Sequence, residues 1–252
     1  MKWIFALVVT CSFAARSADL PVITVTGLNV EPYIIKTEGS KSYSGIMIDI
    51  VNEVISRVEH QADYNITVWA RAYNDVIKGH KEALIPAMKT EERERLLWYP
   101  EEPLLSLRMS LFKAKGADLA WNGALTSLQG ASISVVRGAK VSPDFDQAMD
   151  SGLFKVEKRT DFDLVMLAVA AKRADYGAAD QLMGIWAAKN NGISNDVEIA
   201  EPYLAEVPVY IAFSKEKVDA KFVSRFNKEL VEFKREGGVQ KIIDSYFNND
   251  TL

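Results

Sequence analysis

The hydrophobic and polar positions in the first half of the chain predict alternating strands and helices. Residues 22–26 alternate apolar with polar side chains and are rich in β-branched types, which predicts a strand. Apolar residues recur at helical spacing in 45–57. Further along, 66–69 predicts a second strand, 73–78 a short helical turn that Gly79 ends, and 83–85 a third strand. This order predicts an α/β layer with crossover helices.

A second α/β series follows, bounded by two long extended segments. Residues 104–112 and 203–213 have partial alternation, and we expect each to cross between two lobes, the second returning the chain to the first lobe. Between and after them the pattern predicts a strand, a turn entering a helix, a strongly apolar helix, a short strand ending at Asp180 and a final amphipathic helix broken near Gly237. These are residues 131–136, 137–140, 161–172, 176–179 and 220–246.

Composition and charge narrow the class of protein. The 252 residues are 48% hydrophobic, enough for a sizeable core in one or two domains. The net charge of −4, without a block of Lys and Arg, argues against a nucleic-acid partner. The two histidines, His60 and His80, lie apart and without clustered acids, so the sequence predicts neither a metal site nor a cofactor.

The first 18 residues differ from the rest. Lys2 precedes a short apolar run at 3–9, and small residues follow, which is the layout of a signal peptide. Two small-x-small patterns, at 12–14 and 15–17, leave the cleavage point open. The single cysteine, Cys11, lies inside this segment, so the mature chain would have no thiolate ligand or nucleophile. We therefore expect an exported, periplasmic protein.

One stretch, 85–95, has the features of a seat for a carboxylate. An apolar strand ends at a proline, and Thr90 with the acidic residues after it predicts the start of a helix. Arg93 stands three residues after Thr90 and brings a two-pronged donor to that first turn. The alternative is that Arg93 pairs with neighbouring glutamates and faces solvent.

Several segments together resemble the periplasmic solute-binding proteins of the bacterial amino-acid-binding type, family 3. The resemblance implies an α/β, type II periplasmic-binding-protein fold, in which each lobe is a mixed sheet flanked by helices and a two-strand hinge joins the lobes. Lobe 1 would comprise 19–107 and 207–252, and lobe 2 would comprise 108–206. The segments that carry the resemblance are 31–33, 43–49, 90–93, 98–103, 128–130 with 137–139, 172–180 and the final helix with Gly237 and 246–247.

In this family the lobes close on a ligand between them, which implies roles for particular residues. Tyr33 would lay its ring on the ligand side chain. Arg93 would grip a carboxylate, and Thr90 would belong to the same seat. The backbone N–H groups of Ala139 and Lys140, at a helix start in the second lobe, would hold the same carboxylate.

Asp180 would accept hydrogen bonds from an α-ammonium group of the ligand; the alternative is that it only caps the helix that follows. The chain also departs from the family. Pro86 and Met88 stand where many relatives have small hydroxyl residues, so Met88 joins the predicted site as an apolar member. Arg71, at the end of the predicted second strand, would be a second cation favouring an acidic or multiply anionic ligand, or else a surface salt bridge.

Three functions fit the resemblance. The first is ligand binding without chemistry, in a monomer whose closed form is recognised by an ABC-type importer or by a sensory receptor. The second is a cyclohexadienyl-type dehydratase on the same scaffold, using Glu31, Glu82 or Lys140 as acid or base. The third is a sensor module that has lost its ligand. We predict the first and do not expect an enzyme.

Overall fold

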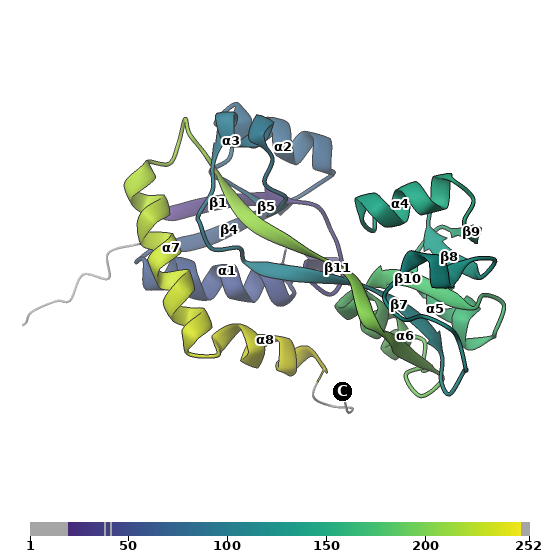
Figure 1. Ribbon diagram of the computed structural model, residues 1–252. Coiled ribbons are helices and arrows are strands. Elements are labelled where there is room, and N and C mark those ends of the chain that lie inside the picture. The colour runs from purple at the N-terminus through teal and green to yellow at the C-terminus, as the bar shows by residue number, and fades with distance from the viewer. Residues whose placement is uncertain (1–19, 38, 41, 248–252) are drawn as a thin grey trace, which may run out of the picture.

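Two long antiparallel strands, β7 (Leu105–Ala114) and β11 (Val197–Ser214), run side by side through the molecule and join its two lobes (Figure 1). The computed structural model describes residues 20–37, 39–40 and 42–247. Within these residues one sheet has nine strands, of which eight follow the order β4-β1-β5-β11-β7-β10-β8-β9 and the ninth, β6, pairs with β11. The prediction of an α/β, two-lobed, type II periplasmic-binding-protein fold with a two-strand hinge is confirmed.

The first lobe holds a mixed sheet between helices. Strand β1 is parallel to β4 and β5, as crossover helices require, and β5 is antiparallel to β11. Its strands are β1 (Val22–Gly27), β2 (Ile35–Lys36), β3 (Tyr43–Ser44), β4 (Gln61–Ile66), β5 (Ala83–Ala87) and β6 (Leu97–Trp98). Its helices are α1 (Ile46–Arg57), α2 (Trp69–Ile77), α3 (Glu91–Leu96), α7 (Ala220–Arg235) and α8 (Gly238–Phe247).

The second lobe repeats this plan with fewer strands. Strand β10 lies between its parallel neighbour β8 and the antiparallel β7. The lobe comprises the 3-10 turn η1 (Leu125–Leu128), the strands β8 (Ser132–Val136), β9 (Lys155–Arg159) and β10 (Tyr176–Asp180), and the helices α4 (Pro143–Asp150), α5 (Phe162–Ala170) and α6 (Gln181–Asn190). Helix α6 packs closely on β7, because a Cβ on Gly184 would lie 2.3 Å from the ring of Phe112.

The loop that carries Tyr33 is held against the start of α1. Gly45 precedes that helix with a φ of 122°, and a Cβ there would lie 2.5 Å from the carbonyl oxygen of Tyr33. The Met47 N–H donates to the same oxygen at 2.9 Å. The apolar face of α1, with Ile50 and Val54 fully buried, anchors the loop to the core of the lobe.

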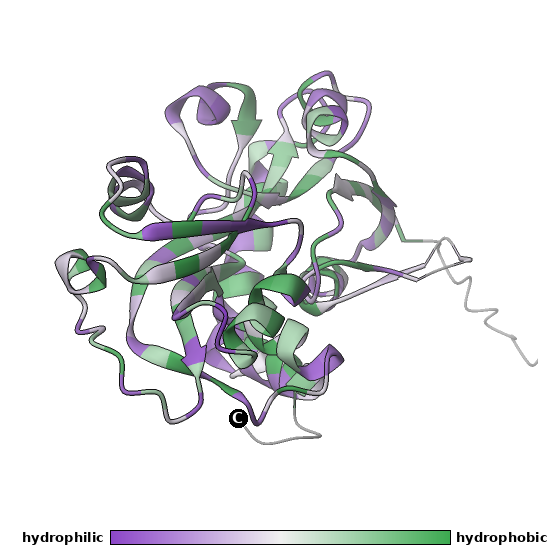
Figure 2. Cartoon of the chain, turned by 90° about the vertical axis from the view of Figure 1, so that its right-hand side faces the viewer, coloured by the Kyte–Doolittle hydropathy of each residue, from purple (hydrophilic) through white to green (hydrophobic). Residues whose placement is uncertain are grey.

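Each lobe has its own hydrophobic core, and hydrophobic positions follow the strands and the helices packed on them (Figure 2). Helix α6 belongs to the second lobe, yet Leu182, Met183, Ile185 and Trp186 pack against the core of the first. This helix therefore supplies an apolar contact between the lobes. The residue limits of the two lobes stay a prediction.

The predicted second strand is wrong in its position. Residues 61–66 form β4, whereas Trp69 begins helix α2. The β-branched residues of 66–68 suggested a strand that continues to 69. The chain instead forms a helix from Trp69, because Ala72 and Val76 on one face of that helix are fully buried against the sheet. The other predicted strands and helices are present, with β11 longer than expected and the final helix divided at Gly237, whose φ is 73°. Strand β9 was not predicted. The helix expected after the turn at 137–140 is α4, and α6 is the helix of the alternative in which Asp180 serves as a cap.

Candidate ligand-binding site

A cleft lies between the lobes on the side of β7 and β11 where α2 and α3 face α4 (Figure 1). It consists of a cavity of about 240 Å³ beside the first lobe and one of about 670 Å³ beside the second. The two are continuous, because Leu28, Met88, Leu107 and Met183 line both. We call these two cavities together the front cleft.

Arg93 forms part of the wall of the smaller cavity. The Thr90 hydroxyl accepts from the Arg93 backbone N–H at 3.3 Å and thereby starts α3 as predicted. The guanidinium donates from Nη1 to the Met88 carbonyl at 2.9 Å and lies 4.9 Å from the Trp69 ring centroid. Within the described residues, its Nε and Nη2 donors have no acceptor, so a ligand oxygen can take both.

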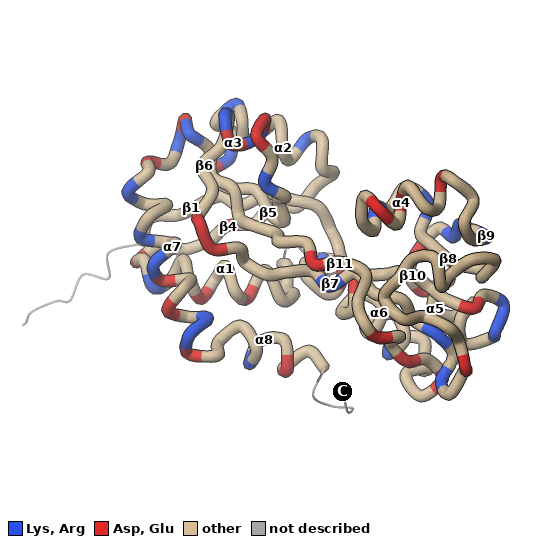
Figure 3. Tube along the Cα trace, viewed as in Figure 1, with Lys and Arg blue, Asp and Glu red and all other residues tan. Residues whose placement is uncertain are grey.

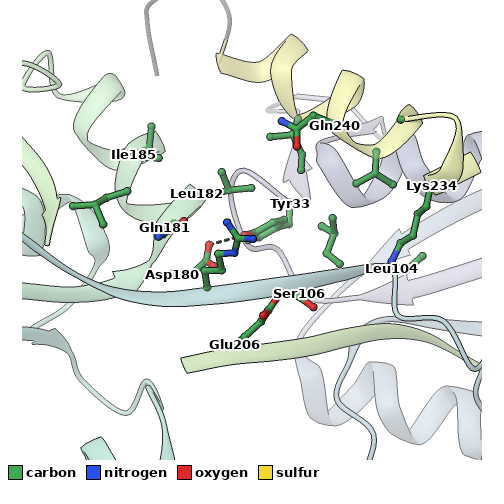
Figure 4. A pocket seen from close by; sticks show the side chains of 16 residues that line it. Tyr33, Leu104, Ser106, Asp180, Gln181, Leu182, Ile185, Glu206, Lys234 and Gln240 are labelled. Carbon is green, nitrogen blue, oxygen red and sulfur yellow. Dashed lines mark hydrogen bonds between the residues drawn. The ribbon is translucent and has the colours of Figure 1, made fainter. Parts of the chain in front are cut away.

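Tyr33 and Asp180 meet between the lobes, as Figure 4 shows. The Tyr33 hydroxyl donates to Asp180 Oδ1 at 2.5 Å, and both residues are 1% exposed. Asp180 stands at the end of β10, where its Oδ1 also accepts the Met183 N–H and caps α6. Its Oδ2 is buried and has no hydrogen-bond partner in the described part of the chain.

Burial controls the protonation of this pair. Removal from water raises the pKa of Asp180, although hydrogen bonds from Tyr33 and the α6 backbone act in the opposite direction. Burial and the nearby Asp180 carboxylate raise the pKa of Tyr33 well above its usual value, so its hydroxyl stays a donor. A positive group that reached Oδ2 would stabilise the carboxylate and lower the pKa of Asp180 again.

The structure corrects the predicted setting of Ala139 and Lys140. Both line the larger cavity, but they lie in the loop after the turn at 137–138. Helix α4 begins only at Pro143, with Ser142 as its cap. A serine followed by proline is a helix-start signature that the sequence carried. The Ala139 N–H already donates to the Val136 carbonyl oxygen at 3.1 Å. Lys140 Nζ lies 3.3 Å from Asp146 Oδ2.

Arg71 does not reach the cleft. It lies on α2, its side chain is 74% exposed, and its nearest acid is Asp75 at 3.9 Å. The surface-pair alternative therefore describes it better than a ligand contact. Its misplacement follows from the wrong position of the second strand, because a strand ending at 69 would have aimed residue 71 toward the cleft.

Several cleft residues were missed, and strand alternation could have found some of them. Along β7, Leu107 and Met109 face the front cleft, whereas Ser106 and Arg108 line a cavity on the opposite side. Met183 lies on α6, the helix that Asp180 caps, but no pattern in the sequence identified it as a cleft residue. Tyr33, Met88, Thr90 and Asp180 lie where the prediction placed them, at or beside the cleft, but their ligand roles stay predictions.

Acidic and basic positions are mixed over both lobes (Figure 3). Across the described residues, no three or more His, Cys, Asp or Glu side chains gather where they could hold a metal ion. No helix in the same residues has the length and apolar character needed to cross a membrane. The expected signal peptide, residues 1–18, lies outside the described residues.

Residues 22–249 match the family model of the bacterial extracellular solute-binding proteins, family 3. The chain belongs to this family. The lysine/arginine/ornithine-binding periplasmic protein of Escherichia coli K12 is 22% identical over 249 residues, which cover 96% of this chain and 95% of that protein. The relatives it matches are periplasmic or extracellular binding proteins, and the chain is a solute-binding protein of this family.

Solved structures agree on the fold. The second substrate-binding domain of GlnP from Lactococcus lactis, in an open conformation, has a TM-score of 0.73 at 18% identity and covers 93% of this chain and 98% of its own. A histidine kinase sensor domain similar to periplasmic binding proteins has a TM-score of 0.66 at 15% identity, with 91% and 97% covered.

This solute-binding protein also has contacts between its lobes behind the two long strands, which we call the rear seam. It consists of α6 with α8 and the loop before Tyr33. Trp186 Nε1 donates to Glu31 Oε2 at 3.1 Å, and its ring lies 6.2 Å from that of Phe247, edge to face. Lys189 Nζ lies 3.4 Å from the Tyr246 carbonyl. Beside this seam is a cavity of about 550 Å³, which Figure 4 shows.

Proposed function

We propose that this protein binds a free α-amino acid, or a closely related small acid, in the front cleft. One observation carries the proposal. Arg93, with two unpaired guanidinium donors, and Asp180, with one unpaired buried oxygen, border the same continuous cleft. An α-amino acid carries a carboxylate and an ammonium group on the same carbon, and the side chains of Arg93 and Asp180 have the opposite charges.

The energetics favour a zwitterion over a ligand with one charge. Charged groups lose hydration when they enter a cleft, and binding succeeds only where opposite charges and hydrogen bonds replace the water. The carboxylate would accept from Nε and Nη2 of Arg93 in a bidentate pair. The ammonium would donate to Asp180 Oδ2, which is otherwise an unpaired buried acceptor and therefore costly.

Binding is coupled to movement in this proposal. The two charged groups come from opposite lobes, so a ligand held by both favours the arrangement in which the lobes are close. The closed form would then be recognised by an importer in the inner membrane or by a sensory receptor. The similar structures include a substrate-binding domain and a sensor domain, and we keep both kinds of partner. The matching relatives are binding proteins, and we propose binding without turnover.

A ligand screen tests the proposal. Purified mature protein is screened by thermal shift against the common amino acids and small di-acids, and each hit is measured by calorimetry. Arg93→Ala should weaken a carboxylate ligand roughly thirtyfold or more, because a desolvated ion pair is lost. Arg95→Ala is the matched control, since Arg95 is an exposed residue on the same helix that does not line the cleft.

The outcomes are distinct. Loss of binding in Arg93→Ala with an unchanged Arg95→Ala supports the assignment. If a carboxylate hit binds Arg93→Ala as tightly as the unmodified protein, the guanidinium is not its partner. If neither amino acids nor di-acids shift the melting temperature, the proposed function is wrong.

A further inference from the structure

The smaller cavity of the front cleft is almost wholly apolar. Arg93 carries the single formal charge among the described residues that line it, and the Tyr33 hydroxyl is already donated to Asp180. The remaining wall is hydrocarbon, thioether and aromatic surface, including Val30, Met47, Trp69, Met88, Met183 and Val209. A ligand held at its carboxylate by Arg93 therefore places its neighbouring atoms against apolar groups.

A cationic side chain is unsuited to this cavity. It would lie beside the Arg93 guanidinium, and the described lining contains no carboxylate to pair with it. An unpaired buried charge and a like-charge neighbour both cost binding energy. The acids of the cleft, Asp146, Asp180 and Glu206, line the larger cavity instead, and Asp146 is already close to Lys140.

A second carboxylate is equally unsuited. It would need a second cation in the smaller cavity, and Arg71, which the sequence suggested for this role, is 74% exposed on α2 and outside the lining. A di-acid would leave one carboxylate against hydrocarbon. The charge pattern thus selects one carboxylate, one ammonium and an apolar remainder.

The volume of the smaller cavity and the chemistry of its lining indicate what kind of apolar side chain the ligand has. The cavity of about 240 Å³ exceeds the roughly 150 Å³ apolar cavity that holds benzene in an engineered protein. Three of its lining residues are methionines, whose unbranched, polarisable side chains adjust to the shape of a guest. Met88 is 50% exposed, so a ligand would cover thioether surface that water now contacts.

We infer that the ligand is an α-amino acid with an extended aliphatic or thioether side chain, and not a cationic or acidic one. This inference rests on the proposed function and assigns its ligand class. It separates the chain from its relative in Escherichia coli, which is named for lysine, arginine and ornithine.

Two amino acids with the same carbon chain test whether the ligand side chain is apolar or cationic. Norleucine and lysine share the same carbon chain, and lysine adds a terminal ammonium. Calorimetry on the unmodified mature protein should find norleucine tighter by about tenfold or more, since burying the extra charge is unfavourable. The series alanine, 2-aminobutyrate, norvaline and norleucine should gain about fourfold in affinity per methylene until the cavity is filled.

A variant then reverses the preference. Leu28→Glu adds a carboxylate to a half-buried loop position that borders both cavities, and it should lower the norleucine-to-lysine affinity ratio about tenfold or more. Leu96→Glu is the matched control, because Leu96 is 44% exposed and lies outside the cleft lining; its ratio should not change.

The failures are distinguishable. If lysine binds as tightly as norleucine or tighter, or if the methylene series is flat, the ligand class is wrong while amino-acid binding stands. If a di-acid binds tighter than norleucine, the class is also wrong. If amino acids do not bind at all, the proposed function fails and the ligand class falls with it.

Discussion

The front cleft and the rear seam lie on opposite faces of the same two strands, and they differ in how completely their polar groups are paired. At the front, two donors of Arg93 have no partner among the described residues, and neither does one oxygen of Asp180, which lines both the front cleft and the rear cavity. At the rear, Trp186 is hydrogen-bonded to Glu31 and packed against Phe247. The polar groups named at the rear are paired without a ligand, whereas those at the front are left for the proposed ligand.

From this difference we expect the rear seam to influence ligand affinity. Lobes that turn about β7 and β11 to narrow the front must widen the rear, because the contacts lie on opposite sides of the strands (Figure 1). A ligand would then gain its two ion pairs only after opposing the packing of α6 on the first lobe. We therefore expect the rear seam to oppose closure, and three changes test this expectation.

The largest effect on stability is expected from Trp186→Ala, which removes the central side chain of the seam. The loss of indole packing and of the bond to Glu31 should lower the free energy of unfolding by about 2 kcal/mol, as seen by urea denaturation. Ligand affinity should nevertheless rise about threefold to tenfold in calorimetry, because closure no longer breaks this contact.

Trp98→Ala is the matched control for this change. Trp98 lies on β6 within the first lobe, under the Lys215 side chain, and does not touch the seam. Its replacement should cost stability without raising affinity. A Trp186→Ala protein whose affinity falls or stays the same would show that the rear contact does not oppose closure.

An intermediate effect on stability, dependent on pH, is expected from Asp180→Asn. Asparagine can still cap α6 and accept from Tyr33. Burial raises the pKa of Asp180 above 3.8, so its folded form binds protons more tightly than its unfolded form. The unmodified protein should therefore lose stability as the pH rises from about 3.8 through the folded-state pKa, and the variant should lack this part of the slope.

Affinity should follow the opposite trend with pH. Protonation of Asp180 removes the charge that faces the ammonium, so affinity should fall in acid for the unmodified protein. Asp180→Asn should bind about tenfold or more weakly near neutral pH, with less pH dependence. Urea denaturation and calorimetry at several pH values measure both trends. Identical pH profiles for the two proteins would remove Asp180 from the ligand site.

The smallest effect is expected from Glu31→Gln. Glu31 is exposed, and glutamine can still accept from Trp186 through its carbonyl oxygen. Stability should change by less than about 0.5 kcal/mol, and affinity should stay within about twofold. A large loss in either measurement would mean that the charge of Glu31 matters, a result that would revive its candidacy as an acid or base.

Sequence patterns identified most elements because hydrophobic period and helix caps are local. The strand at 22–26, the helix after Gly45 and the break at Gly237 all follow from neighbours a few residues apart. The Thr90 cap was equally local, and it located Arg93 at the start of α3. The error at 66–69 arose where β-branched residues gave a local preference that packing on the sheet overruled.

The sequence alone determined the α/β class, the two long crossing strands and the position of Arg93 in the first turn of α3, because each depends on spacing along the chain. The tertiary structure decided what meets across the lobes. The Tyr33–Asp180 hydrogen bond joins residues 147 positions apart, and the apolar cavity gathers side chains from many elements. Such contacts depend on how sheets and helices pack in space, and local spacing carries no information about that packing.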